Sequence, residues 1–263
     1  MSDSVQMEFE TRYGQRFPAL DELEPQTRAK LEGFAGHASQ RRFSSRDVSP
    51  EMVELLAACA FAAPSKSDLQ LRDIIVIRDP ERKAALAGYA KGADFLAEAP
   101  VVLVFCGNAG RLVDLAHAEG QPFPNNHADL LVNAVADAAI SLGWCQLAAA
   151  QLGLAGCAVS GLRDHAADVS TLLELPKLCF PFAGFALGWP DEPRQVTPRL
   201  PLALTLHNER HSGTDDAERI ATYDVRRRTL GRGGWARTRA RQYSVPLRAN
   251  FGAFLRRIGF DLN

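Results

Sequence analysis

The distribution of apolar and polar residues predicts four buried strands in this chain of 263 residues. Each is a short run of mostly β-branched, aromatic or small apolar residues between polar or glycine-rich ends, which is typical of strands covered on both faces. The four runs are residues 73–78, 101–106, 156–160 and 181–187. Helical patterns separate these runs, so the strand and helix order by itself favours an α/β fold.

Two of the helices between the strands have clear start signals. Ser49-Pro50 and Asp79-Pro80 each place a capping side chain before a proline, and a glutamate follows in the first turn. A cap, a proline and a carboxylate all favour the beginning of a helix. We therefore expect helices from these caps to about residue 63 and residue 89.

A longer helix is predicted over about residues 128–152. Polar side chains recur there every four residues among Ala and Leu, at Asp129, Asn133, Asp137 and Ser141. Such a pattern gives one polar stripe on a helix that is otherwise apolar and packs closely on several sides. We expect this helix either at the centre of the core or at a dimer interface.

The rest of the chain has weaker patterns. We expect a loose arm over 1–20, a first helix over 21–36, a loosely structured stretch over 107–126 and a short helix over 168–175. Three segments are predicted: an N-terminal arm and helix (1–32), a main domain (33–206) and an arginine-rich extension that packs on a dimer (207–263).

Composition excludes several classes of function. The net charge of −1 argues against a general nucleic-acid binder. The five cysteines have no metal-ligand spacing, so we expect buried free thiols and no metal site. Polar residues interrupt the longest apolar stretch, 130–152, and the N-terminus has no signal-peptide pattern. These features predict a cytoplasmic protein that does not span a membrane.

Candidate chemistry begins at His37-Ala38-Ser39-Gln40-Arg41-Arg42-Phe43. This stretch gathers a histidine, a hydroxyl and two guanidinium groups, which suit a phosphate ester. Two later stretches strengthen that interpretation: Pro64-Ser65-Lys66-Ser67-Asp68-Leu69-Gln70 and Pro198-Arg199-Leu200-Pro201. A solvated turn remains the alternative for the first stretch, and an ordinary turn for the second.

In order and separation, these stretches resemble the nitroreductase family of FMN-dependent NAD(P)H oxidoreductases, in particular its oxygen-insensitive nitroreductases and flavin reductases. The resemblance covers about residues 33–206. It implies an α+β fold with a central mixed sheet wrapped by helices, and an intertwined homodimer with an FMN in each of two interface sites.

The resemblance also assigns cofactor-binding residues. It places Arg41 near the FMN phosphate or pyrimidine, with His37 and Ser39 at the phosphate end, and Arg199 on the phosphate. Hydroxyls of Ser65 and Ser67 would reach the flavin ring from the other subunit, and Asp68 would either turn away or pair with Lys66. Backbone amides of Val159, Ser160 and Gly161 would face flavin N5 and O4; a helix end followed by a strand is the alternative for that stretch. Two family cations are absent, because Ala38 replaces an arginine and Thr197 a lysine.

The function implied by the resemblance is hydride transfer from NAD(P)H through flavin N5 to a nitroaromatic, quinone or flavin acceptor, by a ping-pong mechanism. The chemistry would be that of the cofactor, so no side chain is assigned a catalytic role. Arg226, Arg227 and Arg228 are candidate ligands for the 2′-phosphate of NADPH; a basic solvated tail or a dimer-clasping arm is the alternative. Two other functions stay open: a flavin carrier or sensor without turnover, and a helical interaction protein without a cofactor.

Overall fold

The computed structural model describes residues 4–212 and 216–263, and the chain falls into two compact units. The first unit joins Met1–Ala38 to Arg194–Leu247, and the second joins Ser39–Pro193 to Arg248–Asn263. Both units therefore combine segments that are distant in the sequence. The division into three consecutive segments stays a prediction.

The second unit is organised around a four-stranded sheet. Its strands are β1 (Arg72–Ile77), β2 (Val101–Asn108), β3 (Ala155–Val159) and β4 (Cys179–Gly188), in the spatial order β1-β2-β4-β3. The four predicted strands are thus confirmed. The expected α+β class is also confirmed, but the sheet is not mixed within the described residues, because every pairing is antiparallel.

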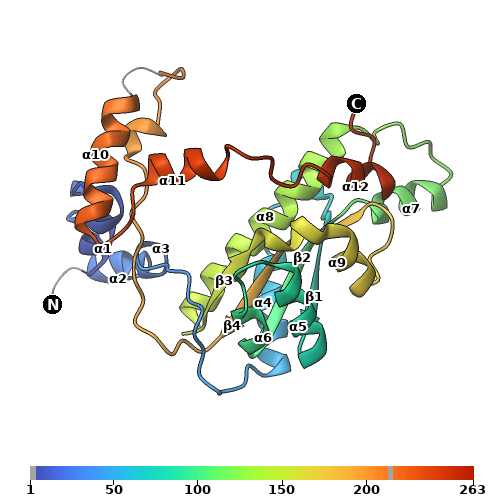
Figure 1. Ribbon diagram of the computed structural model, residues 1–263, viewed down its shortest axis with the longest axis horizontal. Coiled ribbons are helices and arrows are strands. Elements are labelled where there is room, and N and C mark those ends of the chain that lie inside the picture. Colours follow the sequence, from blue (N-terminus) through green and yellow to red (C-terminus); the bar gives the residue numbers. More distant parts are fainter. Residues whose placement is uncertain (1–3, 213–215) are drawn as a thin grey trace. The chain divides into compact units, whose positions relative to one another are not determined.

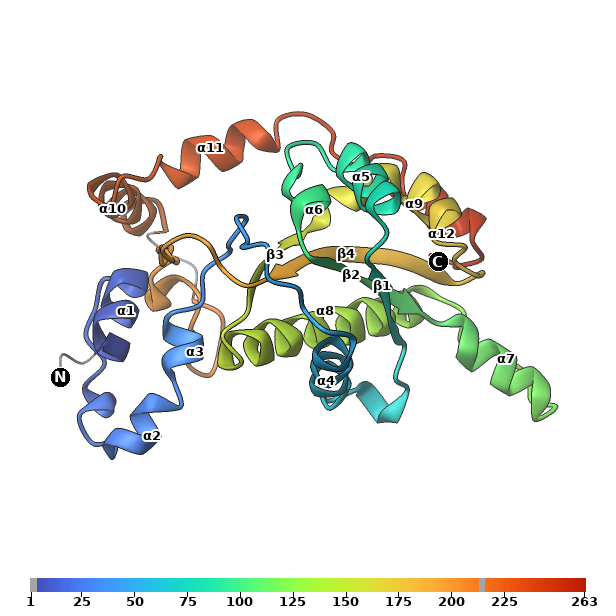
Figure 2. The same cartoon turned by 90° about the horizontal axis from the view of Figure 1, so that it is seen from below.

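Helices cover both faces of this sheet, as Figure 2 shows. Strand β2 is buried on both sides, and its residues alternate between two cores. Val102 and Val104 face α5 (Pro80–Tyr89), α6 (Phe95–Glu98) and α9 (Ala166–Leu172). Leu103 and Phe105 face α4 (Pro50–Phe61) and α8 (Ala128–Gln151). A strand covered in this way must be apolar throughout, which explains why it was recognisable in the sequence.

The two capped helices form where the sequence predicts them. The Ser49 hydroxyl accepts a hydrogen bond from the backbone N–H of Met52 at 3.2 Å. The Asp79 carboxylate accepts one from the N–H of Arg82 at 2.8 Å. Each cap satisfies a backbone donor that the first helical turn leaves unpaired, which fixes the beginning of α4 and α5.

The long helix α8 is the central core helix. By length and by a mean hydropathy of 1.4 it could cross a membrane. It packs instead against the sheet and α4, and its buried face includes the polar side chains of Asp137 and Ser141. The four-residue polar spacing thus marks a face that points partly into the protein.

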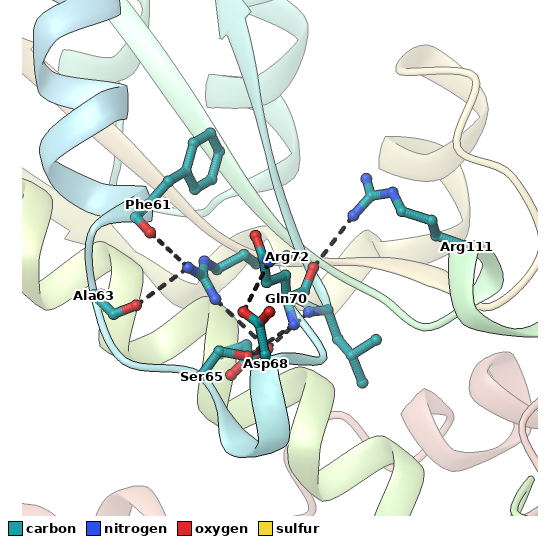
Figure 3. A network of polar contacts seen from close by, with 9 residues as sticks. Phe61, Ala63, Ser65, Asp68, Gln70, Arg72 and Arg111 are labelled. Carbon is teal, nitrogen blue, oxygen red and sulfur yellow. Dashed lines mark hydrogen bonds and ion pairs between the residues drawn. The ribbon is translucent and has the colours of Figure 1, made fainter. Parts of the chain in front are cut away.

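Asp137 is the acceptor in a buried polar network, part of which Figure 3 shows. Its Oδ2 atom accepts hydrogen bonds from Ser65 Oγ at 2.8 Å and from the N–H of Leu71 at 2.7 Å. The same oxygen lies 3.7 Å from Nη1 of Arg72, and both of these charged side chains are at most 4% exposed. Arg72 Nη2 donates to the carbonyls of Phe61, at 2.7 Å, and Ala63, at 3.2 Å. The network joins α8 to the end of α4, the following turn and the start of β1.

A third core lies at the other end of α8, where α7 (Gly110–Ala118) and α12 (Phe251–Arg257) pack (Figure 1). Phe254 and Leu255 of α12 are buried there. The sequence prediction of a loosely structured 107–126 was wrong for the part that forms α7. No residue of α7 is fully buried, and Leu112 and Val113 are among its partly buried residues that pack on this core.

The first unit is mainly helical. It contains α1 (Ser4–Tyr13), α2 (Pro25–Ala29), α3 (Glu32–Ala35), α10 (Asp216–Thr229) and α11 (Trp235–Gln242). The prediction of a loose arm over 1–20 was wrong for residues 4–20, because α1 forms and packs through Val5 and Phe9 on a small core with Leu20 and Ala35; residues 1–3 lie outside the described residues. The single helix expected over 21–36 is two short helices. Short 3-10 helices complete the chain at Pro18–Leu20, Lys66–Asp68, Ser160–His165 and Leu202–Leu204.

Replacing Asp137 tests the importance of the buried network. Asp137→Ala removes the only carboxylate that pairs with buried Arg72 among the described residues. An uncompensated buried charge costs about 3–5 kcal/mol, so we expect a loss of that size in the free energy of unfolding. Urea denaturation followed by circular dichroism measures it. Asp129→Ala is the matched control on the same helix: its ion pair with Lys66 is exposed, so stability should change little. Equal effects of the two substitutions would contradict the assignment.

Candidate functional site

The predicted site residues divide between the two units. His37, Arg199 and Arg226, Arg227 and Arg228 belong to the first unit. The second unit contains the remaining predicted positions: Ser39, Arg41, Ser65, Ser67, Val159, Ser160 and Gly161.

In the second unit, the first motif runs along the ends of β3 and β4. The N–H of Gln40 donates to the carbonyl of Gly156 at 3.0 Å, and the N–H of Ser44 donates to the carbonyl of Trp189 at 2.9 Å. The Gln40 side chain is buried and donates to the carbonyl of Glu192 at 3.2 Å. Only glycine fits at position 156 of β3, because a Cβ there would lie 2.1 Å from the carbonyl oxygen of Ala186. Gln40 therefore fixes the motif on the sheet, a role that sequence analysis missed.

Ser39 and Arg41 gather around Cys157 of β3. Burial raises the pKa of the Cys157 thiol, and the charge of Arg41 and hydrogen bonds with Ser39 and Arg41 oppose that rise. The Arg41 guanidinium also lies over the ring of Phe95, 5.6 Å from its centroid. The structure thus brings together two of the predicted residues. A hydroxyl and a guanidinium from one short segment are suitable donors for a phosphate or a polar ring edge.

The second motif is a tight turn with unusual backbone conformations. Ser67, Asp68 and Gln70 have φ values of 50°, 57° and 53°. Left-handed backbone is unfavourable for residues other than glycine, and several such residues in one turn often mark a functional segment. Asp68 accepts from Gln70 Nε2 at 2.9 Å, while Lys66 pairs with Asp129. Of the two alternatives for Asp68, pairing with Lys66 is not the one that forms.

The two serines of this turn differ in their surroundings. The Ser65 hydroxyl donates to Asp137 and accepts from the N–H of Gln70, both at 2.8 Å. Ser67 is exposed. Ser65 therefore holds the turn in shape, and Ser67 has the freer hydroxyl of the two.

The predicted stretch Val159-Ser160-Gly161 lies at the end of β3. Val159 ends the strand, and Ser160 and Gly161 begin the 3-10 helix. A Cβ at Gly161 would lie 3.2 Å from that of Ala90, so glycine permits close packing on the end of α5. The Ser160 hydroxyl accepts a hydrogen bond from Arg248 Nη2 at 3.4 Å.

In the first unit, His37 and Arg199 line one cavity of about 490 Å³ together with Arg12. The other lining residues are mostly aromatic or apolar: Phe9, Tyr13, Leu31 and Phe34. Burial lowers the pKa of His37, and the positive charges of Arg12 and Arg199 lower it further. Arg12 was not among the predicted site residues, because residues 1–20 were expected to form a loose arm. The structure therefore brings two predicted residues and one unpredicted cation to the same cavity.

The arginine triplet of α10 is not uniform. Arg226 Nη2 donates to the carbonyls of Arg12, at 2.8 Å, and Arg199, at 2.9 Å. Arg227 Nε donates to the carbonyl of Gly233 at 2.9 Å, and its guanidinium also lines a second cavity, of about 450 Å³. Arg228 is exposed. Arg226 is thus committed to backbone contacts, and Arg227 and Arg228 are more accessible to a ligand.

A family model described as the nitroreductase family matches residues 35–189, and one for the C-terminal domain of that family matches residues 197–263. The chain belongs to the nitroreductase family. The resemblance inferred from the three motifs is therefore confirmed.

Individual relatives agree with this membership. The chain is 30% identical over 245 residues to the FMN reductase [NAD(P)H] of Bacillus subtilis, covering 88% of this chain and 98% of the relative. It is 32% identical over 194 residues to the oxygen-insensitive NADPH nitroreductase of Salmonella typhimurium, covering 74% and 79%. Among solved structures, B. megaterium NfrA2 superposes with a TM-score of 0.83 at 28% identity, covering 89% of this chain and 98% of the other.

The position of His37 beside two arginines predicts a specific pH dependence. The pKa of His37 is lowered in the folded protein, so the unfolded chain binds this proton at a higher pH. The free energy of unfolding should therefore fall as pH decreases through about 6.5, the ordinary histidine pKa. His37→Gln should reduce that slope, which urea denaturation at several pH values measures. Arg199→Ala should raise the midpoint of the His37 proton titration seen by NMR. An unmoved midpoint would show that Arg199 does not act on His37.

Proposed function

We propose that the protein is an FMN-dependent oxidoreductase that oxidises NAD(P)H and reduces a small-molecule acceptor. Membership of the nitroreductase family supports the enzyme class and the cofactor, since relatives are named as FMN reductases and NADPH nitroreductases. The observation that carries the proposal is the cavity where His37, Arg199 and Arg12 converge beside aromatic side chains.

The residues present fit FMN. Its phosphate monoester carries negative charge and needs charged donors, which the guanidinium groups of Arg12 and Arg199 provide in the cavity of the first unit. When bound, FMN supplies the redox chemistry by taking hydride from NAD(P)H at N5 and passing reducing equivalents to the acceptor. We assign cofactor binding to His37, Ser39, Arg41 and Arg199, with the Ser65–Ser67 turn and the Val159–Gly161 backbone on the ring.

In this proposal the protein binds and orients, and none of its side chains is a general acid or base. Backbone N–H groups of Ser160 and Gly161 would donate toward the ring edge that gains negative charge on reduction. Both substrates would use one site in turn, which gives ping-pong kinetics. A nitroaromatic, a quinone and a free flavin are all planar, so each could be the acceptor by stacking on the bound flavin.

For the nucleotide, we propose that NADPH is preferred and that Arg227 and Arg228 recognise its 2′-phosphate. Arg228 is exposed, and Arg227 lines the second cavity with the aromatic rings of Tyr223 and Trp235. A guanidinium beside aromatic rings suits a phosphorylated nucleoside.

We also propose a homodimer, in the cytoplasm. An apolar stripe with a spacing of four residues is exposed along α8, with Val132 60%, Ile140 38% and Trp144 45% exposed. Leu55 and Phe61 of α4 are exposed as well. Exposed apolar residues in this number mark an interaction surface. Four of the five free cysteines are buried, which suits a reducing compartment.

Anaerobic reduction tests the proposed function directly. The purified protein, loaded with FMN, should lose the absorption band of oxidised flavin on addition of NADPH, and a nitroaromatic should restore it. NADPH should act at lower concentration than NADH, and this preference should shrink at high salt because exposed charges are screened. If the protein binds FMN stably but NADPH does not bleach the flavin, the alternative of a flavin carrier or sensor without turnover would be favoured. Equal use of both nucleotides would overturn the assignment of the arginines.

A charge in the apolar stripe tests the dimer. Ile140→Arg places a guanidinium in the proposed interface, so we expect monomers in light scattering at concentrations where the unmodified protein is dimeric. Val76→Arg is the matched control, because Val76 is an apolar residue of the same unit that is 44% exposed on β1. A dimer that survives Ile140→Arg would place the interface elsewhere.

A further inference from the structure

The segment before the family match contacts the proposed phosphate-binding residues. The family model begins at residue 35, so α1 and α2 lie outside it. Nevertheless, α1 is joined to the motif around Arg199, because the N–H of Arg199 donates to the carbonyl of Arg12 at 2.7 Å. Arg226 of α10 also donates to that carbonyl. The last turn of α1 is therefore built into the cavity.

Arg12 is only 4% exposed, and its side chain contacts the two segments of this unit that were predicted to bind phosphate, around His37 and around Arg199. Its Nε donates to the carbonyl of Ala35 at 2.8 Å, and its Nη1 to the carbonyl of Thr197 at 3.3 Å. Its Nη2 donates to the carbonyl of His37. A guanidinium has five N–H donors, so these three bonds leave two for a ligand.

The charge of Arg12 is not matched by a bonded carboxylate in the described part of the chain. Glu8 is the acidic residue that attracts it, but the Glu8 carboxylate forms its ion pair with Arg194. Burial lowers the pKa of Arg12, and the nearby positive charge of Arg199 lowers it further. Two guanidinium groups and a histidine thus converge on one cavity, an arrangement that is unfavourable until an anion is bound.

We propose that Arg12, with His37 and Arg199, binds a phosphate monoester, so that the segment before the family match supplies one cation of the cofactor site. The assignment rests on the proposed function, which names two ligands with such a group: FMN through its 5′-phosphate and NADPH through its 2′-phosphate. The flavin phosphate is the primary assignment, because His37 and Arg199 belong to the two phosphate motifs.

The position of Arg12 also explains the two cations missing from the sequence motifs. Ala38 and Thr197 stand where the family pattern has Arg and Lys. The Arg12 guanidinium is bonded to the carbonyl of Thr197 itself and to that of His37, the residue before Ala38. One arginine from α1 thus places a positive charge next to both positions.

Comparison of FMN with riboflavin tests this assignment, because riboflavin lacks only the phosphate. The full-length protein and its Arg12→Ala variant, both freed of flavin, are titrated with each compound while flavin fluorescence is followed. The preference for FMN is the dissociation constant of riboflavin divided by that of FMN. This ratio should fall about 10- to 100-fold in the variant, the range expected for a charge-assisted hydrogen bond. Riboflavin binding itself should stay nearly constant. In parallel, the KM values for NADPH and NADH are measured for both proteins, and a lower preference of the variant for NADPH would report on the 2′-phosphate of the nucleotide.

Two further variants separate charge from structure. Arg16→Ala is the control, since Arg16 is an exposed arginine beyond the end of α1 that pairs with Asp21, and both ratios should remain unchanged. Arg12→Lys keeps the charge but has all of its donors on one nitrogen, whereas Arg12 bonds three carbonyls through three nitrogens, so it should retain part of the preference for FMN. This variant decides the matter if Arg12→Ala does not fold.

The outcomes are distinct. A lower preference for FMN supports the flavin phosphate, and a lower preference for NADPH alone assigns the site to the nucleotide phosphate. An equal loss of affinity for both flavins, or no change in either ratio, would overturn the proposal and leave Arg12 a purely structural residue. If the unmodified protein binds neither flavin, the proposed function fails and this site fails with it.

Discussion

The carboxylate of Asp137 holds together the parts of the second unit that surround its predicted flavin residues. It lies on the central helix α8 and accepts hydrogen bonds from Ser65 and from the backbone of Leu71, while it pairs with Arg72. The Ser65 hydroxyl also accepts a hydrogen bond from the N–H of Gln70, which closes the turn that contains the left-handed residues Ser67, Asp68 and Gln70. A buried charge is tolerated when it is paired and hydrogen-bonded, and this requirement links the shape of the turn to the core helix.

Much of the second unit was predictable because its signals are local. A strand buried on both faces must be apolar along its whole length, and caps such as Ser49 and Asp79 act within four residues of the helix they begin. The polar stripe of α8 was also visible, although the burial of Asp137 was not, because its partner Arg72 is far away in the sequence. The antiparallel pairing of β4 between β2 and β3 depends on contacts across the fold and has no local signal.

The candidate site was only partly predictable, for the same physical reason. Ser39, Arg41, His37 and Arg199 lie in short motifs with unusual combinations of side chains, and so the sequence could propose them as candidates. Gln40 resembles an ordinary polar residue, but its amide and backbone hold the motif on the sheet. Arg12 lies in a helix with little apolar patterning, and its bonds to the carbonyls of residues 23, 25 and 185 positions away define its role. No pattern along the chain reports such contacts.

In the cavity of the first unit, the Arg12 guanidinium is held by backbone carbonyls and, within the residues that the structure describes, not by a carboxylate. Three backbone carbonyls orient the Arg12 guanidinium and partly compensate its desolvation, but they do not neutralise its charge. A carboxylate in their place would neutralise the cation and compete with a bound phosphate. Carbonyl anchoring keeps the positive charge available, and the same device recurs at Arg226, whose guanidinium is bonded to the carbonyls of Arg12 and Arg199. The unit thus positions cations close together, and an anion bound in the proposed site would relieve their repulsion.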